Sequence, residues 1–115
     1  MKVLVLTETD ACCGPMAASF LRDYSTTMEV VSAGRKPLQN VDNLMVVAMR
    51  ECLIDLSGYH PKDVATMAVY AFDVVYECPE LPSPKTIDDF RELRDYIKNE
   101  TYLFFRGLDF LAATV

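Results

Sequence analysis

The sequence predicts one α/β domain over residues 1–115, in which a parallel sheet of three to four strands lies between helices on both faces, as three layers. Two observations predict this class. Short continuous apolar runs, typical of strands buried in a parallel sheet, occur at 2–6, 28–33 and 71–76. Segments with helical periodicity separate these runs, and such alternation favours a doubly wound sheet.

The first expected strand leads directly into a helix. The strand covers Lys2 to Leu6, and Pro15 fits the first turn of a helix that runs to about Tyr24. Proline is tolerated there because its missing N–H has no partner in the first turn. The second strand, at 28–33, ends before Gly34, and a loop follows it.

The middle of the chain predicts two further helices. One opens at Val41 or Asp42 and runs to about Leu53, with its inward positions expected at Leu44, Val47, Ala48 and Cys52. A turn at Ser57-Gly58 precedes a short helix, which begins at Pro61 and ends near Met67.

The C-terminal segment predicts one long helix from about 86 to 112, with Gly107 as its weakest point. Apolar and small residues recur there at steps of three and four, namely Ile87, Phe90, Leu93, Ile97, Thr101, Phe104, Leu108 and Leu111. The stretch after Tyr102 is apolar on more than one face. We therefore expect it to extend the core or to form a homodimer contact.

Charge and composition exclude several classes of function. The net charge of −6 and the pI of about 4.6 argue against binding to nucleic acid or to an anionic membrane. No apolar run has the length of a membrane span, and no signal peptide opens the chain, so the expected location is the cytoplasm. The four cysteines lack the paired spacing of a zinc site and are expected to be thiols; Cys52 is assigned to the core. No cofactor is expected.

The stretch between the first strand and the first helix is the candidate binding loop. It comprises Thr7, Glu8, Thr9, Asp10, Ala11, Cys12, Cys13 and Gly14. A tight loop between a strand and a helix N-terminus is the architecture that holds phosphate and similar oxyanions. The two carboxylates in this loop oppose such binding, because like charges repel. Oxygen ligands could hold Mg²⁺, but a solvated helix cap, with Asp10 in the phosphate's place, is the more common arrangement. No metal site is predicted.

Several segments together resemble the low-molecular-weight protein tyrosine phosphatases and the thioredoxin-coupled arsenate reductases of the same fold, over roughly residues 1–98. The matching segments are Gly14-Pro15-Met16-Ala17, Val31-Ser32-Ala33-Gly34, Ala48-Met49-Arg50-Glu51, Ile54-Asp55-Leu56-Ser57-Gly58, Phe72-Asp73-Val74-Val75 and Phe90 to Ile97. The resemblance implies the phosphotyrosine protein phosphatase I-like fold. It also implies a Cys-x5-Arg loop and an Asp-Pro pair as the catalytic machinery.

The chain departs from that machinery at three positions. Thr7 stands at the position of the family's nucleophilic cysteine, Cys13 at that of its arginine, and Ser83 at that of its acidic residue. A threonine hydroxyl without an accompanying base is a poor nucleophile. We therefore predict a degenerate family member without phosphatase activity, which acts as a binding or regulatory module for a protein or small-molecule partner.

Two alternatives keep a chemical role for the cysteines. The first is a divergent arsenate reductase or protein tyrosine phosphatase. The second is a thiol redox protein that uses Cys12, Cys13 and Cys78. A helix N-terminus lowers thiol pKa values at the loop. The resemblance places Cys78 where reductase members carry a redox cysteine, and so suggests its pairing with Cys12 or Cys13.

Overall fold

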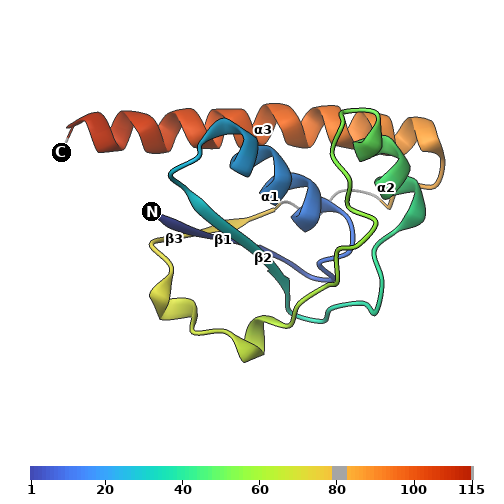
Figure 1. The fold of residues 1–115 in the computed structure, drawn as a ribbon, viewed down its shortest axis with the longest axis horizontal. Helices are drawn as coiled ribbons and strands as arrows, with labels where there is room; N and C mark the ends of the chain where they lie inside the picture. The colour runs from blue at the N-terminus through green and yellow to red at the C-terminus, as the bar shows by residue number, and fades with distance from the viewer. Residues whose placement is uncertain (79–82, 115) are drawn as a thin grey trace.

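The structure is a computed structural model that describes residues 1–78 and 83–114, with side chains described up to residue 108. Its sheet has three parallel strands in the order β2-β1-β3. They are β1 (Lys2–Thr7), β2 (Glu29–Gly34) and β3 (Val74–Glu77). The predicted parallel α/β sheet is confirmed, and the first strand of the sequence is the central one (Figure 1).

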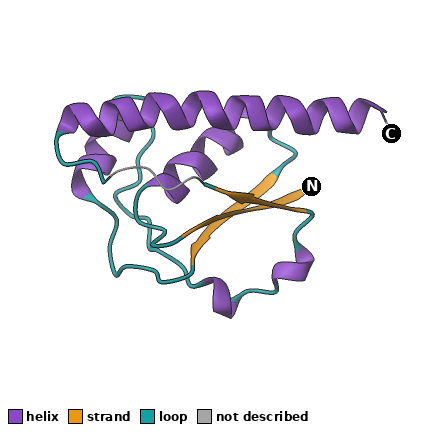
Figure 2. Ribbon diagram, turned by 180° about the vertical axis from the view of Figure 1, so that it is seen from behind, coloured by secondary structure: helices purple, strands orange, loops and turns teal. Residues whose placement is uncertain are grey.

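The helices lie unequally on the two sides of this sheet. Figures 1 and 2 show the α-helices together on one side, and a segment with two short 3₁₀ helices passing on the other. The α-helices are α1 (Cys13–Tyr24), α2 (Asn43–Arg50) and α3 (Ile87–Thr114), and the 3₁₀ helices are η1 (Val64–Thr66) and η2 (Val69–Ala71). The second helical layer is therefore thinner than the first.

The boundaries differ from the sequence prediction in the middle of the chain. The helix expected from Pro61 is only the single turn η1, and β3 starts later than predicted because η2 occupies Val69–Ala71. Helix α2 ends at Arg50, and Leu53 adopts a left-handed backbone with φ of 63°. A helix cannot continue through that conformation.

The inward face of α2 also differs from the prediction. Met45, Val46, Ala48 and Met49 are buried, whereas Leu44 and Val47 are 36% and 44% exposed. Cys52 is only partly buried and is not among the residues of the main core. An uninterrupted apolar run from Leu44 to Met49 contains no polar residue that marks the outer face, so periodicity alone could not orient it.

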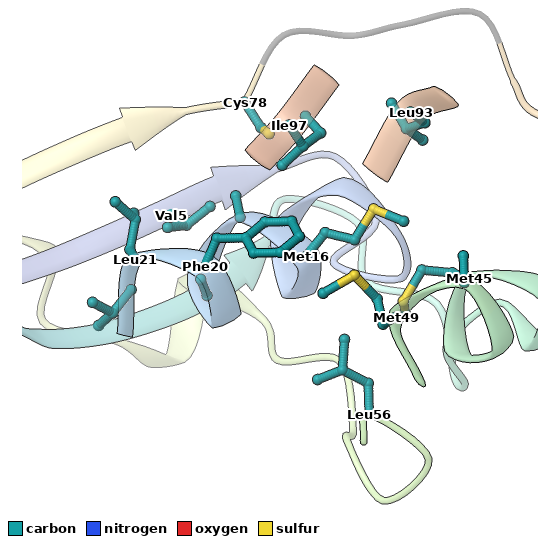
Figure 3. Close-up of a cluster of buried hydrophobic side chains, with 14 of the residues drawn as sticks. Val5, Met16, Phe20, Leu21, Met45, Met49, Leu56, Cys78, Leu93 and Ile97 are labelled. Carbon is teal, nitrogen blue, oxygen red and sulfur yellow. The ribbon is translucent and has the colours of Figure 1, made fainter. Parts of the chain in front are cut away.

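The core fills the space between the sheet and the three α-helices. Figure 3 shows side chains of β1, α1, α2 and α3 gathered there, and α1 packs between the sheet and α3. The fully or nearly fully buried members include Val3, Val5, Met16, Phe20, Leu21, Met45, Met49, Phe90 and Ile97. Burial of this apolar surface is the main force that holds α3 over α1.

Helix α3 confirms the predicted long C-terminal helix and most of its inward positions. Phe90, Leu93, Ile97 and Thr101 are buried, and Phe104 and Leu108 pack partly buried against the core. Tyr102 and Leu103 are exposed, but the side chains of Phe110 and Leu111 lie outside the described residues. The homodimer contact therefore stays a prediction. Over the part of the chain that the structure describes, no helix has the length and apolar character needed to cross a membrane.

Candidate functional site

The binding loop is held from one side by the chain that follows β2. Backbone N–H groups of Arg35, Lys36, Leu38 and Asp42 donate to loop carbonyls at 2.7–3.0 Å. The accepting carbonyls belong to Thr7, Glu8, Thr9 and Ala11. Gly34 allows this approach, because a Cβ there would lie 2.9 Å from the carbonyl oxygen of Glu8. The loop carbonyls are thus occupied on their outer side.

The loop amides are less occupied than its carbonyls. The N–H of Asp10 donates to Oγ1 of Thr7 at 3.1 Å. Within residues 1–78 and 83–108, no acceptor takes the N–H groups of Thr9, Ala11 or Cys12. Free N–H groups next to a helix N-terminus are favourable for a partner with partial negative charge.

A pocket of about 300 Å³ opens beside these amides. Its walls come from four parts of the chain, namely the binding loop, the 38–42 segment, the segment after β3, and α3. The full lining is Thr9, Ala11, Cys12, Leu38, Asn40, Asp42, Ser83, Pro84 and Phe90. The sequence-predicted residues Cys12 and Ser83 therefore share one pocket, and none of its described lining residues is lysine or arginine.

Asp10 occupies a different place from the one predicted. It is completely buried, rather than solvated, and its backbone is left-handed, with φ of 51°. Its Oδ2 accepts hydrogen bonds from the Tyr59 hydroxyl at 2.5 Å and from the Lys62 N–H at 2.9 Å. The Asp10 carboxylate therefore ties the loop to the 59–62 segment.

The other oxygen of Asp10 has no hydrogen-bond partner among the described residues. Oδ1 lies close to Gly14, because a Cβ on Gly14 would be 3.0 Å from Oδ1. The same Cβ would also be 3.0 Å from Oγ1 of Thr7. Burial raises the pKa of Asp10 above its ordinary 3.8, although the hydrogen bond from Tyr59 acts in the opposite direction. An unpaired carboxylate oxygen in the interior destabilises the fold when the group is charged.

Sequence reasoning missed the partners of Asp10. Tyr59 and Lys62 lie 49 and 52 residues away in the chain, and Ser32 of β2 hydrogen-bonds the same Tyr59 hydroxyl. Lys62 also places its ammonium over the Tyr59 ring, 4.5 Å from the centroid. No local pattern connects these residues, because the sheet topology alone brings them together.

Three of the four cysteines meet at the start of α1. The thiol of Cys78 donates to the carbonyl oxygen of Cys13 at 3.8 Å, and Cys12 is the chain neighbour of Cys13. The neighbouring thiols of Cys12 and Cys78 lower the pKa of Cys13, and the interaction with Cys13 raises the pKa values of Cys12 and Cys78. Cys52 takes no part in this cluster.

The remaining predicted chemistry has little support in the geometry. The only described hydrogen bond of Thr7 Oγ1 comes from the Asp10 N–H, so no base is hydrogen-bonded to this hydroxyl among the described residues. Of the nearby arginines, Arg22 binds the carbonyl of Val30 and Arg35 pairs with Glu77 at 2.7 Å. Over the described residues, no group of three or more histidine, cysteine or acidic side chains is arranged to hold a metal ion.

Solved structures with the same architecture identify the fold. An arsenate reductase in a phosphate-binding state superimposes with a TM-score of 0.83 at 20% identity, over 92% of this chain and 97% of its own. The tyrosine phosphatase Wzb from Escherichia coli K30, in complex with sulphate, gives 0.83 at 14% identity, over 93% and 97%. The YwlE arginine phosphatase from Geobacillus stearothermophilus gives 0.77 at 15% identity, over 98% and 96%.

The chain has the fold of these arsenate reductases and tyrosine phosphatases. The predicted phosphotyrosine protein phosphatase I-like architecture is therefore confirmed. No protein-family model and no curated protein sequence matches the chain. At such identities the likeness concerns the fold, so the activity has to be argued from the residues of this chain.

Proposed function

We propose that this protein is a thiol redox protein that does not hydrolyse phosphate esters. The observation that carries the proposal is the position of the Cys78 thiol, 3.8 Å from the carbonyl oxygen of Cys13 and beside the adjacent pair Cys12-Cys13. A thiolate is the reactive form of cysteine, and the neighbouring thiols lower the pKa of Cys13, which favours that form. Cys78 lies beside it as the natural partner for a disulfide.

The chemistry is a two-electron exchange with an external disulfide. The Cys13 thiolate attacks one sulfur of the external disulfide, a mixed disulfide forms, and the first half leaves as a thiolate. Cys78 then loses its proton to solvent and attacks the Cys13 sulfur. The Cys13–Cys78 bond forms, and the second half leaves. The external disulfide is reduced to two thiols, and a reducing dithiol reverses both steps.

Mass spectrometry tests this proposal on the reduced full-length protein. One equivalent of dithiodipyridine is added to a Cys52→Ser variant, which removes the cysteine outside the cluster. We expect a Cys13–Cys78 linkage in the peptide map and two released pyridinethiones per protein. The Cys78→Ser variant should stop at the mixed disulfide. Absence of the linkage, with the mixed disulfide persisting in the parent, would contradict a redox role.

A second candidate is the catalytically inactive binding or regulatory module. It is supported by Thr7, whose hydroxyl oxygen accepts the Asp10 N–H and is hydrogen-bonded to no base among the described residues. With Cys13 at the position expected for arginine, no described cation lines the pocket. We expect no hydrolysis of p-nitrophenyl phosphate and no arsenate-dependent oxidation of the cysteines. Hydrolysis that is lost in Thr7→Ala, or oxidation that requires arsenate, would instead favour a divergent phosphatase or arsenate reductase.

A further inference from the structure

The pocket beside Cys12 is acidic, although it adjoins the free amides of the loop. Asp42 is the only charged residue among its described lining residues. The hydrogen bond with Cys13 is the main cause of the raised pKa of Cys12, and the charge of Asp42 adds to it. The negative charge of Asp42 therefore acts on the Cys12 sulfur, which lines the pocket.

An oxyanion in this pocket would meet the negative charge of Asp42 and no positive charge among the described lining residues. Repulsion between unit charges about 6 Å apart weakens binding about threefold in water, and considerably more near a protein surface. Loop amides alone lack the bidentate cation that usually offsets such repulsion.

The remaining walls favour an uncharged group with an apolar part. Leu38, Pro84 and Phe90 supply apolar surface, while Asn40 and Ser83 can exchange hydrogen bonds with a neutral polar atom. Phe90 is part of the rigid core, so that wall of the pocket is fixed.

We propose that the thiol site takes uncharged disulfides and rejects anionic ones and oxyanions, with Asp42 as the residue that sets this selectivity. The inference rests on the proposed function, since the attacking Cys13 directly follows Cys12, which lines the pocket. In the first exchange one S–S bond of the substrate breaks, one protein–substrate S–S bond forms, and the leaving thiolate takes up a proton from solvent.

Two chromogenic disulfides of opposite character test the selectivity. Dithiodipyridine is uncharged at neutral pH, and dithiobis(nitrobenzoate) is a dianion. Stopped-flow rates for the first exchange are measured in the Cys52→Ser background at low salt, and are divided by the rates for free mercaptoethanol. We expect the normalised ratio of neutral to anionic rates to exceed ten.

Matched variants assign the effect to Asp42. Asp42 caps α2 by accepting the Leu44 N–H at 2.9 Å, and asparagine keeps this cap. Asp42→Asn should narrow the ratio about threefold. Asp23→Asn, which removes an exposed charge at the other end of α1, should leave it unchanged. High salt should narrow the ratio in the parent, because it screens an exposed carboxylate.

Defined outcomes would overturn the inference. A normalised ratio near one, or slower reaction with dithiodipyridine when millimolar phosphate or arsenate is present, means that the pocket accepts anions. An unchanged ratio in Asp42→Asn removes this residue as the determinant. The Cys78→Ser variant separates the two proposals: it loses the internal disulfide but should keep the selectivity of the first exchange.

Discussion

The Tyr59 hydroxyl donates a hydrogen bond to Oδ2 of Asp10 at 2.5 Å, across 49 residues of sequence. Through this contact the chain after α2 reaches beneath the binding loop. The same hydroxyl also hydrogen-bonds Ser32 of β2. Tyr59 therefore connects the loop, the sheet and the 59–62 segment at a single atom.

Removal of that hydroxyl should destabilise the protein. Tyr59→Phe leaves a fully buried carboxylate with only the Lys62 N–H as a donor, and loss of a partner by a buried polar group costs about 1 to 3 kcal/mol. Urea denaturation measures the change. Tyr70→Phe is the matched control, because Tyr70 is 93% exposed. Equal stability of the two variants would show that the contact contributes nothing.

Asp10→Asn should be more stable than the parent protein at neutral pH, and this advantage should be smaller at acidic pH. Because burial raises the pKa of Asp10, the folded state binds its proton more tightly than the unfolded state does. Stability that this group contributes below pH 3.8 is therefore lost as the pH rises through the pKa of the folded state. An amide does not titrate, so the variant carries no buried negative charge at the atom that now lacks a hydrogen-bond partner, Oδ1.

Unfolding midpoints across this pH range test the effect of the amide. The advantage of Asp10→Asn over the parent should grow from acidic to neutral pH, and Asp23→Asn should show no such trend. A constant difference at all pH values would contradict a raised pKa at Asp10.

The Cys13 thiol should ionise at low pH only while its two thiol neighbours are present. Its pKa is lowered first by the neighbouring thiol of Cys12 and then by that of Cys78. In a Cys52→Ser background, thiolate absorbance near 240 nm should report one sulfur that ionises below the ordinary range of a cysteine thiol. Cys12→Ala and Cys78→Ala should each shift the transition to higher pH. An unchanged titration in both variants would mean that the thiols do not interact.

Gly34→Ala should weaken the support of the loop. A Cβ at this position would meet the backbone of Glu8 at 2.9 Å and of Asp10 at 3.0 Å, and backbone atoms cannot move aside cheaply. Overpacking of this kind costs about 1 to 3 kcal/mol. Gly58→Ala is the control, because nothing lies within 4 Å of a Cβ there. Thermal unfolding of the two variants should therefore differ, with Gly34→Ala lower.

The sequence predicted those elements whose pattern is local. The apolar runs predicted the buried strands β1 and β2. The regular spacing of apolar residues predicted α3, because a helix buried on one face repeats its apolar residues every three or four positions. The predicted inward face of α2 was wrong except at Ala48, since its residues are uniformly apolar. The predicted start of β3 was wrong because η2 is apolar too. In both cases, the position of neighbouring elements decided between arrangements that the local pattern allows.

The contacts of the candidate site could not be predicted from the sequence. The resemblance drew attention to Thr7, Cys13 and Cys78, and in the structure the Cys78 thiol lies 3.8 Å from the carbonyl oxygen of Cys13. The burial of Asp10 was not foreseen, because a carboxylate on a short loop is ordinarily solvated. Its burial depends on donors from Tyr59 and Lys62, which only the complete fold supplies.

The central position of β1 has a consequence for folding during synthesis on the ribosome. The strand made first pairs with β2 early, but its other neighbour, β3, lies at Val74–Glu77. The core is complete only when Phe90 and Ile97 of α3 arrive. Because these long-range pairings close the fold, a ribosome must release most of the chain before the central strand is covered. Until then the apolar side chains of β1, which are buried in the finished fold, stay exposed in the nascent chain.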